Sequence, residues 1–289
     1  MRGRRTILGQ DLRPHLCRRC RDRHPDGVLW SFVLRGISIE VGGHINDSLW
    51  RSGWDFVFAS SNVLLAILFG TALGNVIRGV PLDGSGMFSM SLFTDFSARG
   101  RVGILDWYTL SVAVFATVLL SAHGATYLRL KTVGPVHERS ERLARLLWLI
   151  TAVLFVVVSA ETTVVRPELF QSLLQRPLAW VSVVVIGAAV WALSTGLRGH
   201  AESRAFAGSC GVIAGLLAGA GASLFPVVLH STLSPEHSMT AYSGATAERG
   251  LRTALFWWPV AVALALTYFF VIMRIYAGKV RPSQETQGY

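Results

Sequence analysis

The residues of this sequence best placed to do chemistry are the few ionisable side chains that interrupt its apolar segments. They are Arg35, Glu40, Asp55, His123, Glu161 and His230. A charge inside a membrane is costly, so an ionisable group there is by default a functional hypothesis. The chemistry open to such groups is proton transfer, contact with a quinone head group or, for histidine, iron ligation.

Arg35 and Glu40 lie in the short apolar segment "VLWSFVLRGISIEV". They are five residues apart, which does not stack them well as a helical ion pair. One interpretation is a proton route or a contact with a quinone head. The alternative is that both side chains extend to the cytoplasmic interface. The sequence leaves both interpretations open.

The other ionisable groups have simpler interpretations. Asp55 follows Trp54 at the start of a span, where a carboxylate suits a helix N-terminus, so a capping role is favoured. For His123, in "SAHGATYLRLKT", a hydrogen-bonded structural imidazole is favoured over an iron ligand, because no axial partner is evident. Glu161 is expected to pair with the nearby Arg166.

The cysteines do not indicate a catalytic or metal site. Cys17 and Cys20 lie between His15 and His24, and two thiolates with two imidazoles could complete a zinc tetrahedron. That spacing matches no recognised finger and the flanking arginines repel a cation, so zinc is not favoured. Cys210 is expected to pack inside a span. No nucleophile with its base, phosphate loop or dinucleotide fingerprint is evident, so we expect no self-contained catalytic site.

The composition is that of a membrane protein. Of the 289 residues, 52% are hydrophobic and 15% are charged, and the mean hydropathy is +0.46. Soluble domains carry nearer to about a quarter charged residues. A membrane helix needs ~20 apolar residues. Six segments meet that requirement, at about 55–79, 104–130, 147–165, 178–197, 206–229 and 253–277.

A seventh apolar segment, 28–41, is too short to cross a membrane unaided and is expected to form a partial helix. Residues 1–27 carry eight arginines against three aspartates and lack the apolar core of a signal peptide. We expect a disordered basic arm there, or a misplaced start. The transmembrane helical domain is then expected at 28–277, followed by a cytoplasmic tail at 278–289.

The net charge of +10 would suggest nucleic acid as a partner of a soluble protein. No basic motif interleaved with aromatic residues is present, so we exclude that partner. One side of the predicted spans collects eleven basic residues and the other side seven. The positive-inside rule places the first set, with the C-terminus, in the cytoplasm.

The connections and the pattern of small residues predict an all-α polytopic fold. No strand alternation and no short repeat is evident. Two loops on the predicted outer side, 80–103 and 230–252, are long, and we expect either a functional role or a flexible cover. Small residues recur every four positions in two spans, which predicts close helix packing. These residues are Ala66, Gly70 and Gly74 in one span and Gly211, Gly215, Gly219 and Ser223 in the other.

The stretch "LFGTALGNVIRGVPLD" places its polar residues in the last turn of a span. Asn75 is expected to bond to a neighbouring helix. Arg78 can reach the membrane interface while its stem stays in apolar surroundings, so an anchoring role explains it without chemistry. Pro81 lies past the last turn, where it ends the helix at little cost.

Five motifs, taken in order, resemble subunit II of the cytochrome bd-type ubiquinol oxidases. They are "LRGISIE", "WDFVF", "LFGTALGNVIRGVPLD", "HGATYLRLKTVG" and the pair Phe225-Pro226 followed by "MTAYSGA". The resemblance runs from about residue 28 to residue 277. It implies two pseudo-symmetric four-helix bundles with eight spans, of which this chain keeps six and, at 28–41, the second half of the family's second helix.

The resemblance also implies a function and a partner. The family couples oxidation of quinol to reduction of dioxygen to water. Subunit II binds no haem firmly, and haems b and d are expected in the larger subunit I, the partner of this chain. A structural quinone in subunit II and a small accessory subunit are compatible with the resemblance. The implied location is the bacterial cytoplasmic membrane.

The resemblance assigns residues of this sequence to the family's polar and motif positions. Arg35 and Glu40 match the polar pair of the second helix and are the implied candidates for a proton route or a quinone contact. The positions implied to be structural are Trp54, Asp55, Asn75, Arg78, Pro81, His123 and Lys131.

The N-terminal part departs from the family pattern. Members begin with a whole helix and a loop that bears tryptophan and aspartate, and residues 1–27 resemble neither. The proton-handling acid of that loop would then be absent. Two alternatives therefore stay open. One is a transporter of small solutes, which needs broken helices or a polar cavity at mid-membrane. The other is a truncated remnant without function.

Overall fold

The computed structural model describes residues 51–94, 96–97, 102–199, 201–245 and 247–279. The predicted arm at 1–27 and the partial helix at 28–41 lie outside these residues, as does the predicted tail beyond Lys279. The chain divides into two units, residues 1–58 and 59–289. The helix packing described for this chain lies within the second unit.

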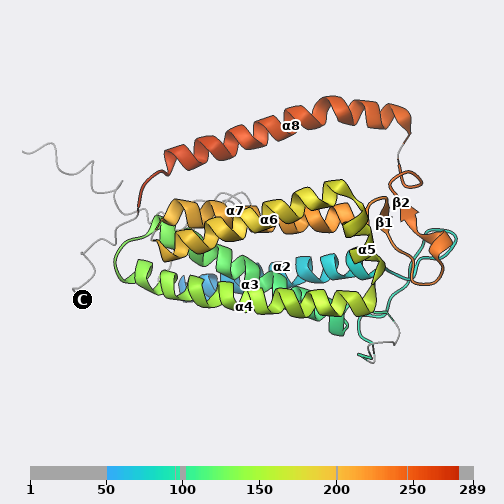
Figure 1. The fold of residues 1–289 in the computed structure, drawn as a ribbon, viewed down its shortest axis with the longest axis horizontal. Helices are drawn as coiled ribbons and strands as arrows, with labels where there is room; N and C mark the ends of the chain where they lie inside the picture. The colour runs from blue at the N-terminus through green and yellow to red at the C-terminus, as the bar shows by residue number, and fades with distance from the viewer. Residues whose placement is uncertain (1–50, 95, 98–101, 200, 246, 280–289) are drawn as a thin grey trace, which may run out of the picture. The chain divides into compact units, whose positions relative to one another are not determined.

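Six long helices form the described part of the chain (Figure 1), each long and apolar enough to cross a membrane. They are α2 (Arg51–Arg78), α3 (Trp107–Lys131), α4 (Pro135–Val165), α6 (Pro177–Arg198), α7 (Glu202–Leu224) and α8 (Glu248–Ile275). The prediction of six spans in an all-α membrane protein is confirmed. A short helix, α5 (Glu168–Gln175), connects α4 to α6 where a loop was predicted.

Several helix ends differ from the predicted spans, and two of these differences have clear local reasons. Helix α4 begins at Pro135, because the polar segment before residue 147 continues the helix beyond its apolar part. Helix α7 ends at Leu224, before Phe225 and Pro226. Proline cannot donate a backbone hydrogen bond, so the apolar residues after it leave the helix. His230, which directly follows the predicted span, therefore lies outside the helix.

A small antiparallel ribbon occupies the connection after α7, where no strand was predicted. Strand β1 (Val227–Leu229) pairs with β2 (Met239–Thr240), and a 3₁₀ turn, η3 (Pro235–His237), lies between them. Strands of two or three residues are too short to show alternation in a sequence. The long loop at 230–252 is thus partly ordered by backbone pairing.

The core lies among α3, α4, α6 and α7. Helix α3 packs against α4 and α7, and α6 packs against α7. The cluster at their centre joins small alanines to a few large side chains, among them Trp148 on α4 and Leu193 on α6. Buried Trp148 donates its indole N–H to Thr126 Oγ1 at 2.9 Å. Because lipid gives no hydrophobic drive between helices, such close contacts and internal hydrogen bonds stabilise the bundle.

Glycines of both stripes lie in close contact with a neighbouring helix. An ideal Cβ on Gly70 would stand 2.6 Å from the Cα of Ala113 on α3, and one on Gly215 would stand 2.6 Å from Ile186 on α6. The predicted close packing is confirmed at both positions. Helix α7 is also continuous through its glycine-rich part, so it is not one of the broken helices that a transporter would need.

Candidate functional site

A buried ion pair connects the end of α2 to the start of α3. Arg78 pairs with Asp106, and their side chains are only 7% and 1% exposed. Arg78 is therefore enclosed by protein, and its partner is Asp106 rather than the membrane interface that the anchoring interpretation assumed. The sequence reasoning considered each span alone, whereas the carboxylate comes from the next helix along the chain.

Asp106 also caps α3. Its Oδ1 accepts a hydrogen bond from the Thr109 backbone N–H at 3.0 Å, and Thr109 Oγ1 accepts one from the Asp106 N–H at 2.9 Å. This reciprocal capping box satisfies N–H groups that a helix start leaves without partners. Asn75 adds a further link from α2, donating to the carbonyl of Ile104 just before α3 at 3.0 Å. These residues form the Arg78 cluster, which also includes Arg166. Its members are Asn75, Arg78, Asp106, Thr109 and Arg166.

Arg166 satisfies the C-terminal end of α2 instead of pairing with Glu161. Its Nη1 donates to the carbonyl of Ile77 at 2.9 Å. A cation at a helix C-terminus is also stabilised by the negative end of the helix dipole. Glu161 accepts from Ser111 Oγ at 3.0 Å, and its second oxygen is buried with no hydrogen-bond partner among the described residues. The predicted Glu161–Arg166 pair is wrong.

The segment after Arg78 seats the loop that follows α7. Gly79 adopts φ +101°, a left-handed conformation that favours glycine. The Val80 N–H then donates to the carbonyl of His230 at 2.9 Å, and Ser231 Oγ donates to the carbonyl of Leu82 at 2.8 Å. Pro81 lies between these two contacts. The two long loops predicted on one side are thus joined by their backbones.

Three groups near these loops, all outside the spans, have shifted pKa values. Burial lowers the pKa of His230, and the positive charge of Arg166 lowers it further. Burial also lowers the pKa of Arg166, against the opposing effect of Glu168. Asp83 has a lowered pKa, chiefly because its carboxylate accepts a hydrogen bond from Ser85 Oγ. His230 is consequently neutral at neutral pH.

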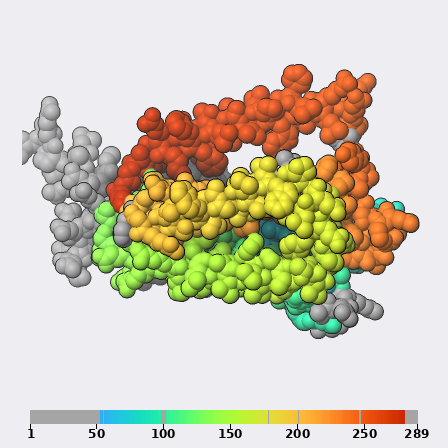
Figure 2. Space-filling view, in the orientation of Figure 1, coloured from blue at the N-terminus to red at the C-terminus, as the bar shows by residue number. Residues whose placement is uncertain are grey.

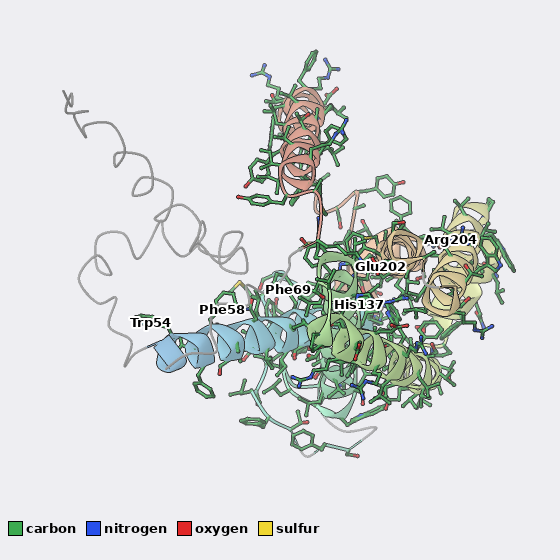
Figure 3. All side chains as sticks on the ribbon, turned by 90° about the vertical axis from the view of Figure 1, so that its left-hand side faces the viewer. Trp54, Phe58, Phe69, His137, Glu202 and Arg204 are labelled. Atoms are coloured by element: carbon green, nitrogen blue, oxygen red, sulfur yellow. The ribbon has the colours of Figure 1, made fainter. Side chains whose placement is uncertain are left out.

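A second ionic group lies at the other end of α3. Arg129, whose side chain is 1% exposed, places Nη2 3.6 Å from Glu141 Oε1 on α4 and donates weakly to the Gly196 carbonyl on α6 at 3.4 Å. His137 Nδ1 donates to the Arg129 carbonyl at 2.9 Å and lies 3.6 Å from Glu202 on α7 (Figure 3). These residues, Arg129, His137, Glu141 and Glu202, form the Arg129 cluster, which joins four helices.

The tail of α8 attaches to this same end of the bundle. Lys131 donates to the carbonyl of Tyr276 at 2.8 Å, and Lys279 pairs with Glu202 at 2.6 Å. The sequence reasoning assigned Lys131 a structural role without a partner, and the structure supplies this contact. None of the residues of α8 is buried.

The two clusters are separated by the length of one membrane span. Asp106 and Arg129 are 23 residues apart along α3, about 35 Å at 1.5 Å per residue. Between them, His123 Nδ1 lies 2.9 Å from Ser209 Oγ on α7. This arrangement pairs charges at both ends of an apolar bundle, and the imidazole of His123 between them is bonded to a protein hydroxyl. Within the described residues no group of three His, Cys, Asp or Glu side chains could hold a metal ion.

Several predicted residues lie elsewhere. Arg35 and Glu40 lie outside the described residues, as do His15, Cys17, Cys20 and His24. Trp54 is exposed near the start of α2. Asp55 lies inside α2, which the structure describes from Arg51 onward, so it is not the N-cap.

Sequence reasoning missed the two residues that organise the clusters. Asp106 was not singled out from the sequence, although its position three residues before Thr109 at the start of a span is a capping pattern. Arg129 was counted only among the eleven basic residues of the predicted cytoplasmic side. Its place one turn after the small residue Ala125 could have indicated the packed face of α3, which the structure confirms because both residues are buried.

Residues 27–276 match the protein family described as cytochrome bd terminal oxidase subunit II. The chain is 24% identical to the probable cytochrome oxidase subunit 2 of Haemophilus influenzae and to the cytochrome bd-I ubiquinol oxidase subunit 2 of Escherichia coli K12. Each match covers 83% of this chain and 69% of the relative. The cytochrome bd ubiquinol oxidase subunit 2 of Bacillus subtilis is also 24% identical, over 78% of this chain and 63% of that protein.

Proposed function

Because the chain belongs to the cytochrome bd terminal oxidase subunit II family, we propose that it is the non-haem subunit of a quinol:oxygen oxidoreductase. In this proposal a larger subunit I carries haems b and d, oxidises quinol and reduces dioxygen to water. The observation that carries the proposal is the family match over residues 27–276, a range that includes all six membrane helices.

The role of this chain in the complex is to support the haem-bearing subunit within the membrane. Two features support that role. The Arg78 and Arg129 clusters connect the ends of the helices, which gives a preformed bundle for a partner to contact. Helix α8 has no buried residue, so its whole apolar surface is available to a membrane-embedded partner or to lipid.

The proposed location is the bacterial cytoplasmic membrane, with the C-terminus in the cytoplasm. The multi-pass character follows from the six apolar helices. The orientation rests on the excess of basic residues on one side, eleven against seven. The Arg129 cluster and the end of α8 would then face the cytoplasm, and the two joined loops would face outward.

A proton route through Arg35 and Glu40 is the finer part of the proposal. It rests on the resemblance of "LRGISIE" to the family motif. The variants R35Q and E40Q are expected to lower quinol oxidation by the complex while leaving its haem content unchanged. Loss of haem together with activity would instead make these residues necessary for assembly.

Co-expression with subunit I from the same bacterium tests the main proposal. A tagged copy of this chain is expected to co-purify with the partner, and the complex is expected to show reduced-minus-oxidised haem bands and quinol oxidase activity. Deleting this chain is expected to reduce the amount of assembled partner.

Two results would contradict the proposal. If the chain inserts but never co-purifies with subunit I, the truncated remnant becomes the better interpretation. If the chain purified alone contains stoichiometric haem, it is not a non-haem subunit.

A further inference from the structure

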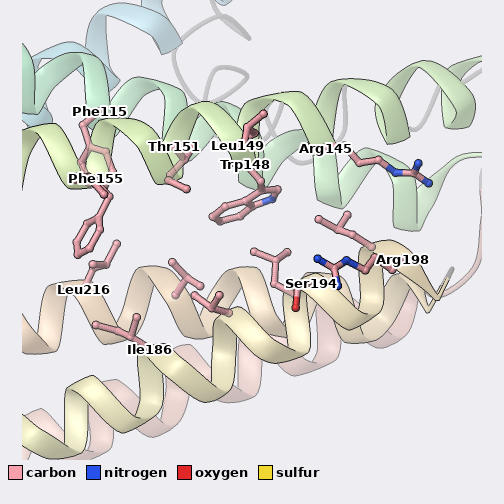
Figure 4. A pocket seen from close by; sticks show the side chains of 16 residues that line it. Phe115, Arg145, Trp148, Leu149, Thr151, Phe155, Ile186, Ser194, Arg198 and Leu216 are labelled. Carbon is pink, nitrogen blue, oxygen red and sulfur yellow. The ribbon is translucent and has the colours of Figure 1, made fainter.

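A large cavity opens between α4 and α6. Its volume is about 930 Å³, at the upper end of the range of about 300–1,000 Å³ for small-molecule sites. Apolar side chains line most of it, with Phe155 on α4, Ile186 on α6 and Leu216 on α7 among them. Figure 2 shows the hollow in the surface between α4 and α6, and Figure 4 shows its lining.

Two arginines lie at one end of this cavity. Arg145 of α4 and Arg198 of α6 are both part of its lining, and Figure 4 shows them together at the same end. Arg145 pairs with Glu141, which also lies 3.6 Å from Arg129. Arg198 has no ion pair with a residue that the structure describes. Glu141 is therefore shared between Arg129 and Arg145, and the charge of Arg198 is not balanced by an ion pair with a described residue.

The length of the cavity matches the depth of one membrane leaflet. Along α4 it extends from Arg145 to Val156, eleven residues, or about 16 Å at 1.5 Å per residue. Along α6 it extends from Arg198 to Ile186, twelve residues. Half of a hydrocarbon core of about 30 Å is about 15 Å. An occupant with its polar group between the arginines would therefore reach about the middle of the bilayer.

We propose that this cavity binds an anionic glycerophospholipid, with an acyl chain along α4 and α6 and its phosphate at Arg145 and Arg198. Two guanidinium groups match a phosphate in charge and in hydrogen-bond geometry. Basic pockets between membrane helices bind anionic head groups in this way. A lipid with a cationic head would place its own positive charge beside the arginines. A quinone head is neutral and does not require them.

The proposal does not rest on the proposed function. It uses only residues of α3, α4, α6 and α7, so it holds for the chain in or out of an oxidase complex. Failure of the co-expression experiment would leave it unaffected, and its own failure would leave the oxidase assignment unaffected.

The test is a lipid titration of the full chain, delipidated in detergent and analysed by native mass spectrometry. The probes are palmitoyl-oleoyl phosphatidylglycerol and the matching phosphatidylcholine. Phosphatidylglycerol is expected to bind the first site at least about tenfold more tightly, from the attraction of two arginines near the surface. The double variant R145Q/R198Q is expected to bind both lipids equally. Should that variant fail to fold, R198Q alone removes an exposed arginine without breaking an ion pair.

Matched control variants distinguish the effect of the two arginine charges on lipid binding from the effect of the cavity's shape. R142Q changes an exposed arginine of α4 that does not line the cavity, and it is expected to leave binding unchanged. A152W fills the cavity and is expected to remove the first site for both lipids, whereas A160W, outside the lining of the same helix, is expected to retain it. Equal binding of the two lipids by the unmodified chain would overturn the proposal. So would undiminished selectivity in the arginine variants, or displacement of the phosphatidylglycerol by an equal amount of ubiquinone.

Discussion

Arg78, in the last turn of α2, and Asp106, the N-cap residue of α3, form an ion pair that is almost fully removed from solvent. The loop between them is exposed over much of its described part, residues 79–94, 96–97 and 102–105. The pair therefore fixes where the second of these helices starts relative to the end of the first. Asp106 also accepts a backbone hydrogen bond from α3. The same carboxylate therefore caps the N-terminus of α3 and neutralises the charge of Arg78.

Breaking this pair is expected to destabilise the bundle. Removing one partner of a buried ion pair costs about 3–5 kcal/mol, because the other charge stays buried without compensation. The variants R78Q and D106N should each lower the unfolding midpoint of the purified protein, and D106N keeps an oxygen for the capping bond. The double variant should lose less than the sum of the two single losses, which a double-mutant cycle measures.

R252Q is the matched control for that cycle. Arg252 pairs with Glu248 on α8 at 2.7 Å, and both side chains are more than three-quarters exposed. Surface pairs contribute little, so this variant should unfold near the unmodified protein. Additive losses for R78Q and D106N would mean that the two residues act separately.

Gly79 is expected to tolerate no side chain. Its φ of +101° is strained for other residues, and an ideal Cβ would stand 2.7 Å from the carbonyl oxygen of His230. The variant G79A should therefore weaken the pairing between the two long loops and speed proteolysis within 230–252. G86A is the control, because Gly86 has φ +79° but nothing within 4 Å of the added Cβ. Equal proteolysis of the two variants would show that the contact with His230 has no effect.

The joined loops are expected to loosen as pH falls. Burial and Arg166 lower the pKa of His230 below its ordinary value of 6.5, while Glu168 opposes that shift. The unfolded chain then binds a proton at a higher pH than the folded chain does. Stability is complete above pH 6.5 and decreases as pH falls toward the folded pKa. Proteolysis of the loops between pH 7.5 and 5.5 measures this decrease, and the variant H230Q should reduce the pH dependence.

The span pattern and the helix packing could be predicted because lipid imposes them locally. A run of apolar residues predicts a membrane span. Small residues that recur every four positions, as around Gly70 in α2 and around Gly215 in α7, predict a close contact between helices. The ends of the elements depended on single residues. Pro226 shortened α7, and the polar segment from Pro135 lengthened α4.

The pairing of charges could not be predicted, because it joins residues far apart in the sequence. Arg166 was assigned to Glu161, five residues away, but it bonds to the carbonyl of Ile77. Arg129 and Glu141 come from different helices, and their separation depends on the turn between α3 and α4. Single-sequence reasoning finds costly charges in apolar segments, but the partner of each charge is fixed only by the tertiary packing.

Gly208 is expected to be the position of α7 least able to accept a methyl group. An ideal Cβ there would stand 2.4 Å from the backbone nitrogen of Leu193 and 2.8 Å from the carbonyl of Ala189, both on α6. Backbone atoms cannot turn aside as a side chain can, so G208A must move α7 away from α6. Overpacking of this kind costs about 1–3 kcal/mol. Thermal unfolding in detergent should show the loss.

The control for this variant is G187A, on α6. An ideal Cβ at Gly187 would meet nothing within 4 Å, and alanine is the better helix former by about 0.5–1 kcal/mol. G187A should therefore unfold at or above the temperature of the unmodified protein, and G208A below it. If both variants were equally stable, α6 and α7 would not be in the close contact that the glycines of α7 indicate, and the core among α3, α4, α6 and α7 would need a different packing.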